Sequence, residues 1–208
     1  HFYGYIDSSG KFVIKPQFEW ADVFQNGMAA VILGGNMGYI DPTGKFIIKP
    51  EFDMIYSFSG DLAMFKDNGR YGFIDRSGRL IVEPRYEAAE SFSNGFAPVK
   101  LNGRWGFINQ NGEMVIEPQY LSVSKFTEGL ARVTTAEGIK GYIDSQGQLV
   151  LKCKFDGIGS FCEGLAFCVD IKMGGQVYRC GYIDKTGKIV IKQEFDDLQG
   201  FCEGLAGA

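Results

Sequence analysis

The sequence predicts an all-β fold built from six tandem repeats of about 34 residues, and three observations support it. Short β-branched runs alternate with turn sequences along the chain. The 29 glycines and 18 phenylalanines suit many tight turns around aromatic cores. The third observation is a glycine that recurs at spacings of 34, 34, 34, 35 and 40 residues, at Gly4, Gly38, Gly72, Gly106, Gly141 and Gly181. We therefore interpret residues 1–208 as a single repeat array.

A hairpin turn is expected shortly after each of these glycines, where Asp or Asn is followed three residues later by another glycine. The Asp or Asn side chain can accept a backbone N–H two residues on, and the glycine can adopt a positive φ. Calcium ligation is the alternative, but the acidic ladder of a repeated calcium site is missing. The six predicted turns are Asp7–Gly10, Asp41–Gly44, Asp75–Gly78, Asn109–Gly112, Asp144–Gly147 and Asp184–Gly187.

A short strand is expected after each turn, as at Met114-Val115-Ile116. Its apolar residues are consecutive rather than alternating, which indicates that both faces are at least partly covered. Pro118 follows this strand, and three other repeats have proline at the same place. Because proline cannot donate to a ladder, we expect it to end the strand.

The connector that follows carries two aromatic residues six positions apart, such as Tyr120 and Phe126. They recur at one register in all six copies, so we expect them to pack in the core, with a short helical turn as one option for the connector. A strand with a recurring small residue, here Ala131, comes next. Hairpin loops such as Asn102-Gly103 lead from such strands into the next glycine. Three antiparallel strands per repeat would form a meander that must stack on its neighbours.

The segment Arg104-Trp105-Gly106-Phe107-Ile108-Asn109-Gln110-Asn111-Gly112 resembles the WG β-repeat family, and the resemblance extends over essentially the whole chain. The closing motif Phe-x-x-Gly-Leu-Ala is present at Phe126–Ala131 and Phe161–Ala166. The resemblance implies a bacterial, often exported or envelope-associated repeat protein without a shared catalytic site. Tryptophan occupies the family's aromatic position once; the other copies have Tyr3, Met37, Tyr71, Lys140 and Cys180.

The variable copy number of such arrays favours an open β-solenoid or superhelical array over a ring. A closed β-propeller is the alternative, because six small meanders lie within its usual range of blades. The first copy lacks its leading strand and the last ends at Gly207-Ala208, so we expect the chain to be part of a longer array. Contact between the Gly204–Ala208 and Tyr3–Asp7 segments would instead indicate closure.

Several function classes are disfavoured by composition. A net charge of -4 gives no basic surface for nucleic acid, and no apolar run is long enough to span a membrane. His1 is the single histidine, which leaves no Ser/His/Asp, Cys/His or histidine-based metal site. We expect no cofactor and no phosphate-binding loop, because the glycines here punctuate strands.

The five cysteines lie in the last two repeats without a Cys-x-x-Cys pair, so a zinc site, buried thiols and a disulfide all remain open. Cys168 and Cys180 flank an expanded hairpin. A three-residue loop at Met173–Gly175 would place them opposite one another, within reach of a disulfide. A two-residue turn at Gly174-Gly175 would send them to opposite faces. We expect the disulfide in an exported protein and two thiols in the cytosol.

The sequence favours a non-catalytic scaffold that presents a β surface to a protein or glycan partner. Trp20, Arg132 and Phe167 are the candidate contacts, because they occupy registers whose residues vary while the framework repeats. An exposed aromatic without a role is the other interpretation of Trp20. A glycosidase with paired carboxylates is the alternative function, although no site interrupts the repeat pattern. The register of Trp20 holds, in the other copies, Met54, Ala88, Ser122, Gly157 and Asp197.

Overall fold

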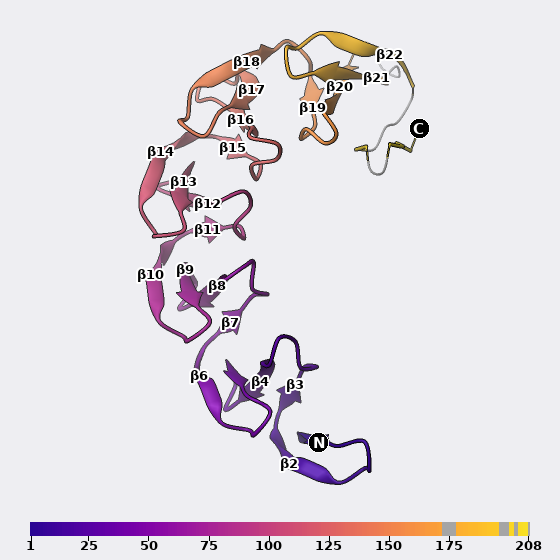
Figure 1. Ribbon diagram of the computed structural model, residues 1–208. Coiled ribbons are helices and arrows are strands. Elements are labelled where there is room, and N and C mark those ends of the chain that lie inside the picture. Colours follow the sequence, from indigo (N-terminus) through magenta and orange to yellow (C-terminus); the bar gives the residue numbers. More distant parts are fainter. Residues whose placement is uncertain (172–177, 196–199, 202–203, 208) are drawn as a thin grey trace. The chain divides into compact units, whose positions relative to one another are not determined.

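The computed structural model describes residues 1–171, 178–195, 200–201 and 204–207 (Figure 1). The chain forms two compact units, His1–Ser91 and Phe92–Ala208, and each is considered by itself. Strands take up more than half of the chain, and the described residues contain no α-helix. The prediction of an all-β fold is therefore confirmed. Within the same residues, no helix is present that could cross a bilayer.

The first unit contains a two-stranded sheet and two four-stranded sheets, all antiparallel and each wound in chain order. The two-stranded sheet pairs β1 (Tyr3–Ile6) with β2 (Phe12–Phe18). The second sheet consists of β3 (Trp20–Ala21), β4 (Ala29–Leu33), β5 (Asn36–Ile40) and β6 (Phe46–Phe52). The third consists of β7 (Met54–Ile55), β8 (Leu62–Asp67), β9 (Arg70–Asp75) and β10 (Leu80–Tyr86), and β11 (Ala88–Ala89) follows.

The second unit repeats the same antiparallel meander. Its first sheet includes β12 (Phe96–Leu101), β13 (Arg104–Asn109) and β14 (Met114–Tyr120). The fifth sheet of the chain consists of β15 (Ser122–Val123), β16 (Ala131–Thr134), β17 (Lys140–Ile143) and β18 (Leu149–Cys153). The sixth consists of β19 (Gly157–Ile158), β20 (Leu165–Ile171), β21 (Tyr178–Asp184) and β22 (Ile189–Phe195). Tandem stacked meanders are confirmed, while the choice between an open and a closed array stays a prediction.

A fourth strand in five of the six sheets corrects the prediction of three. It comes from the connector, for which the sequence suggested a helical turn. In the second sheet, Trp20 pairs with Ile32 and Ala21 with Val31, and β7, β15 and β19 repeat this two-residue pairing. A strand of two residues is too short to show a periodic pattern in the sequence, so only the tertiary pairing reveals it.

Proline does not end the strand after the turn, as the sequence had suggested. Strand β14 continues through Pro118 to Tyr120, but its register changes on the way. Ile116 pairs with Phe107, whereas Tyr120 pairs with Trp105. Proline therefore lies in a bulge of an edge strand, where its missing N–H removes no ladder hydrogen bond.

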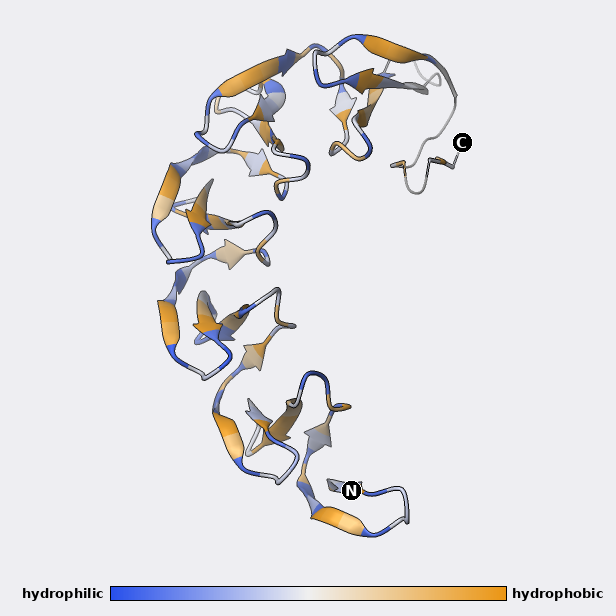
Figure 2. Ribbon diagram, viewed as in Figure 1, coloured by the Kyte–Doolittle hydropathy of each residue, from blue (hydrophilic) through white to orange (hydrophobic). Residues whose placement is uncertain are grey.

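The apolar run after each turn is also more exposed than its composition suggested. The third residue of the run is buried in the first four copies, as at Ile116, but the middle residue is exposed in four of the six copies. Val13 is 57% exposed, Val115 39% and Val150 52%, so the outer face of the strand is only partly covered at these residues. Figure 2 shows the outer strands β2 and β18 as largely hydrophobic. The nearby proline or charged residue protects such an edge from pairing with another strand.

The recurring glycine is explained by a close approach of two backbones. A Cβ on Gly106 would lie 2.3 Å from the carbonyl oxygen of Ile116, and one on Gly141 would lie 2.2 Å from that of Leu151. Gly38 meets the same obstacle at Ile48. These carbonyls belong to the bulged fourth strand, so only glycine lets that strand pack against the third.

The cores lie between successive sheets. In the first unit, one cluster contains Phe18, Val31 and Ile40 from neighbouring sheets. In the second unit, another contains Phe126, Val133 and Ile143, and the predicted aromatic anchor Tyr120 belongs to it. The turn glycine of one sheet lies against an apolar residue of the preceding sheet. Such glycine pairs within the two units are Gly44 with Ile14, Gly78 with Ile48, Gly147 with Ile116 and Gly187 with Leu151.

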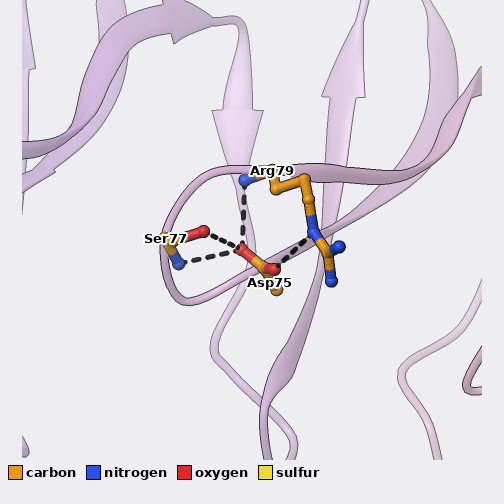
Figure 3. Close-up of polar contacts among 3 residues, drawn as sticks. All are labelled: Asp75, Ser77 and Arg79. Carbon is orange, nitrogen blue, oxygen red and sulfur yellow. Dashed lines mark hydrogen bonds and ion pairs between the residues drawn. The ribbon is translucent and has the colours of Figure 1, made fainter.

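The six predicted turns are confirmed. Their glycines have φ between 78° at Gly147 and 86° at Gly44. At Asp75, Oδ1 accepts hydrogen bonds from the Ser77 N–H at 2.9 Å, the Ser77 hydroxyl at 2.6 Å and the Arg79 N–H at 3.0 Å (Figure 3). Oδ2 accepts from Arg79 Nε at 3.0 Å. The Ser77 hydroxyl bond, followed by bonds from Arg79 and the backbone, lowers the pKa of Asp75. The carboxylate therefore caps its own turn.

Replacing Gly106 by alanine tests the close approach of the two backbones. Because the new Cβ would clash with a backbone carbonyl rather than with a flexible side chain, we expect the free energy of unfolding to fall by about 2 to 3 kcal/mol. Gly103→Ala is the control, since its Cβ would meet nothing within 4 Å and only its φ of 74° is unfavourable. That variant should lose about 1 kcal/mol. Urea unfolding curves measure both, and equal losses would contradict the explanation.

The Asp75→Asn variant tests the turn cap through pH. The pKa of Asp75 is lower in the folded protein than in the unfolded chain, so its contribution to stability is present above the unfolded pKa. It is lost as pH falls through the folded pKa. Asparagine keeps the acceptor oxygen without titrating, as Asn109 does in the natural sequence. The unfolding free energy of the variant should therefore fall less than that of the wild type between pH 5 and pH 2. The same dependence of unfolding free energy on pH in both proteins would contradict the role of Asp75 as a turn cap.

Candidate functional site

A pocket of about 230 Å³ in the second unit contains one of the predicted contact residues, Arg132. It lies where the fifth sheet meets β19, the first strand of the sixth. The residues that line it are Ser122, Arg132, Thr134, Lys140, Asp156, Gly157 and Ile158. We treat this group, named the Arg132 pocket below, as the candidate functional site.

The register of the fifth sheet brings the polar side chains together. Thr134 is the partner of both Ser122 on β15 and Lys140 on β17. Paired residues lie on the same face, and so do residues two apart along a strand. Arg132 therefore shares this face with Thr134, Ser122 and Lys140. The matched register of β15, β16 and β17 thus brings the four polar side chains to one face.

Hydrogen bonds tie the two cationic side chains to the segment that begins the sixth sheet. Arg132 Nη1 donates to the carbonyl oxygen of Ile158 at 2.6 Å, and Lys140 Nζ donates to that of Asp156. Beside them, the Ser122 hydroxyl donates to Thr134 Oγ1 at 2.9 Å. Guanidinium has five N–H donors and ammonium three. One hydrogen bond holds each cationic group in place, and the other N–H donors of each group are not used by that bond.

The same segment is supported from the core side. The Tyr142 hydroxyl donates to the carbonyl oxygen of Gly159 at 2.6 Å, and burial raises the pKa of Tyr142 well above its usual value. A Cβ on Gly159 would lie 2.3 Å from the ring of Phe167. Arg132, Tyr142 and Phe167 therefore all contact the Ile158-Gly159 backbone. Two of the three predicted contact residues meet here, although Phe167 does not line the pocket.

Trp20 lies elsewhere, at the start of β3 in the first unit, and is 38% exposed. Met54, at the same register of β7, is 44% exposed. The first unit also has a pocket of about 120 Å³ that includes Arg76. That guanidinium lies 4.8 Å from the ring centroid of Phe58, pairs with Asp61 at 3.5 Å and donates to the Gly60 carbonyl oxygen. The Arg76 guanidinium therefore already interacts with a ring, a carboxylate and a carbonyl oxygen of the fold.

Sequence reasoning identified Arg132 but missed its neighbours in the pocket. The signal was present at Lys140, which occupies the register of Met37, Tyr71 and Trp105 in earlier repeats. A cation at a position otherwise apolar or aromatic marks a change in the repeat. The pairing of Lys140 with Thr134 and Ser122 could not be inferred, because β15 is a two-residue strand.

The expected opposition of Cys168 and Cys180 is wrong. Cys168 pairs with Gly181, and Cys180 pairs with Val169. This register is shifted by one residue from the one that would place the two cysteines opposite each other. It matches the register expected for a two-residue turn. The Cys180 side chain lies outside the described residues, so the disulfide itself stays a prediction. Cys153 is partly buried, which raises the pKa of its thiol to about 11.

Comparison with known families identifies the repeat. The WG containing repeat matches residues 3–36, 37–71, 71–105, 105–135, 141–167 and 181–208. The chain belongs to the WG repeat family. The resemblance inferred from the residues around Trp105 is thereby confirmed across six copies. In this WG repeat chain, no group of three or more His, Cys, Asp or Glu that could hold a metal ion is found among the described residues.

No curated protein matches the WG repeat chain. Among solved structures, Hsv2 of Kluyveromyces lactis with loop 6CD replaced by a Gly-Ser linker is 10% identical, with a TM-score of 0.47 over 84% of this chain and 67% of that one. The Kluyveromyces lactis Hsv2p structure is 10% identical, with a TM-score of 0.43 over 81% and 74%. The WD40 β-propeller domain of Doa1 is 10% identical, with a TM-score of 0.40 over 82% and 66%. Scores this low transfer no function.

Removing the Tyr142 hydroxyl tests the support of the Ile158-Gly159 segment. Tyr142→Phe leaves the Gly159 carbonyl oxygen without this buried donor, so we expect the free energy of unfolding to fall by about 1 to 3 kcal/mol. Tyr120→Phe is the matched control, because the hydroxyl of Tyr120 lies 3.4 Å from the Gly147 carbonyl oxygen, a weaker bond. Chemical denaturation compares the two variants, and a larger loss for Tyr120→Phe would contradict the assignment.

Proposed function

We propose that this WG repeat chain is a non-catalytic binding module that presents its β surface to a protein or glycan partner. One observation carries the proposal: the first residue of each two-residue edge strand differs from sheet to sheet while the framework around it repeats. This position holds Trp20 in β3, Met54 in β7 and Ser122 in β15, all of them exposed. A position that recurs at the same place in each sheet but carries different side chains is suited to binding a partner.

The acidic side chains of the repeat framework have structural roles in hydrogen bonds and ion pairs. The turn aspartates cap backbone N–H groups, as at Asp75. Glu128 accepts a hydrogen bond from the Gly164 N–H and pairs with Lys185 at 3.0 Å, and Glu163 accepts one from the Gly204 N–H. Carboxylates used in this way link one repeat to the next. The proposal therefore assigns them to the scaffold and includes no catalytic pair.

Trp20 is the residue with which to test the proposal, because large aromatic side chains dominate binding energies at interfaces. Partners would be captured from a lysate and from a glycan array with the wild-type chain, and their affinities measured by titration calorimetry. Trp20→Ala should weaken the selected partner at least about tenfold, which corresponds to roughly 1.4 kcal/mol, and should leave the thermal midpoint unchanged.

The control for Trp20 is Val13→Ala, which changes an exposed apolar residue of the two-stranded sheet, at β2. It should bind the same partner with wild-type affinity. Equal binding by Trp20→Ala and the wild type, or equal weakening by both variants, would refute the proposed surface.

A further inference from the structure

We propose that the Arg132 pocket binds a carboxylate supplied by an acidic side chain of a protein partner. The inference deepens the proposed binding function and rests on it. It assigns a ligand chemistry to one place in the second unit, at the junction of β15, β16 and β17 with β19.

The charge of the lining favours an anion. Arg132 and Lys140 contribute two positive charges, and Asp156 contributes one negative charge. Ion pairs elsewhere in the fold involve Arg76, Arg79 and Lys185. Thr134 and Ser122 add hydroxyl groups to the lining. The N–H groups of Arg132 and Lys140 and the hydroxyl of Thr134 can donate to an oxyanion, while the Ser122 hydroxyl donates to Thr134 Oγ1.

Arg132 is also prepared for this role by its fixed position. Its Nη1 bond to the Ile158 carbonyl oxygen holds the guanidinium at the pocket wall, so less side-chain entropy is lost when a ligand binds. The planar guanidinium group matches a carboxylate through two parallel N–H donors. An ammonium group such as that of Lys140 adds charge without a fixed direction.

The size of the pocket limits the ligand to a small group. Sites for whole small molecules usually measure about 300 to 1,000 Å³, whereas this pocket measures about 230 Å³. A side chain that enters from a larger partner fits this volume. The pocket also adjoins β15, which is the edge strand of its sheet. An extended peptide can lie along such an edge while one of its side chains enters a pocket.

Comparison between repeats shows that stacking alone does not require these cations. Earlier repeats have Ala30, Met64 and Pro98 at the register of Arg132. They have Met37 and Tyr71 at the register of Lys140, and the first of these packs against the core between the second and third sheets. Apolar residues therefore serve the framework at these positions. The paired change to two cations in one sheet gives that sheet a different surface chemistry.

The test is an NMR titration of the full ¹⁵N-labelled chain with N-acetyl-glutamate N-methylamide. We expect chemical-shift changes at Ser122, Arg132, Lys140 and residues 156–158, with a Kd on the order of millimolar that rises with salt. The neutral glutamine analogue should bind at least tenfold more weakly. Equal shifts with both compounds, or no shifts at these residues, would overturn the proposal.

Variants and competing anions sharpen this test. Arg132→Ala and Lys140→Trp introduce residue types that other repeats have at the same registers, so both should fold. Each should reduce binding of the glutamate analogue at least tenfold. Lys152→Ala, an exposed change on β18 outside the lining, should leave it unchanged. Tighter binding of inorganic phosphate or glucuronate than of the glutamate analogue would overturn the assignment to an acidic side chain.

The pocket and the general binding function fail in different ways. If a captured partner binds Arg132→Ala as tightly as the wild type but loses affinity for Trp20→Ala, the binding module stands and the pocket assignment is wrong. If the glutamate analogue binds as expected while Trp20→Ala has no effect on any partner, the pocket stands and the surface centred on Trp20 is wrong.

Discussion

The sheets of both units depend on one close contact between backbones. At the glycine of the third strand, the carbonyl oxygen of the fourth strand approaches so closely that a Cβ on Gly106 would lie 2.3 Å away. A bulge in the fourth strand produces this approach, and proline is tolerated there because the bulge lies on an edge strand. Because each sheet needs this contact once, glycine recurs in the sequence at a spacing of about 34 residues.

Stacking between sheets supplies the rest of the stability. A single meander has no enclosed core, and the buried clusters of each unit draw residues from neighbouring sheets. Turn glycines such as Gly147 lie against the apolar strand of the sheet before, at Ile116. Because these contacts involve few registers, other registers tolerate many residue types. Variation at Trp20 and its counterparts is therefore compatible with an unchanged framework.

The Arg132 pocket illustrates how such variation creates a site. Lys140 occupies a register that is aromatic or Met in earlier repeats, and Arg132 occupies one that holds Ala30 in the first unit. Both side chains hydrogen-bond to backbone carbonyls at the start of the sixth sheet. The hydrogen bond from Tyr142 to Gly159 holds the junction between the two sheets in place. Arg132 and Lys140 line a polar pocket beside it.

The sequence by itself determined the repeat, the turns and the aromatic core, because each depends on local patterns that recur at a fixed spacing. Asp75 and Gly78 specify their hairpin within four residues. Tertiary structure alone decided the two-residue strands, the passage of β14 through Pro118 and the register of Cys168 against Gly181. It also assembled Ser122, Arg132 and Lys140 into one pocket. These features depend on how neighbouring strands pair across their connections, and no local pattern encodes that register.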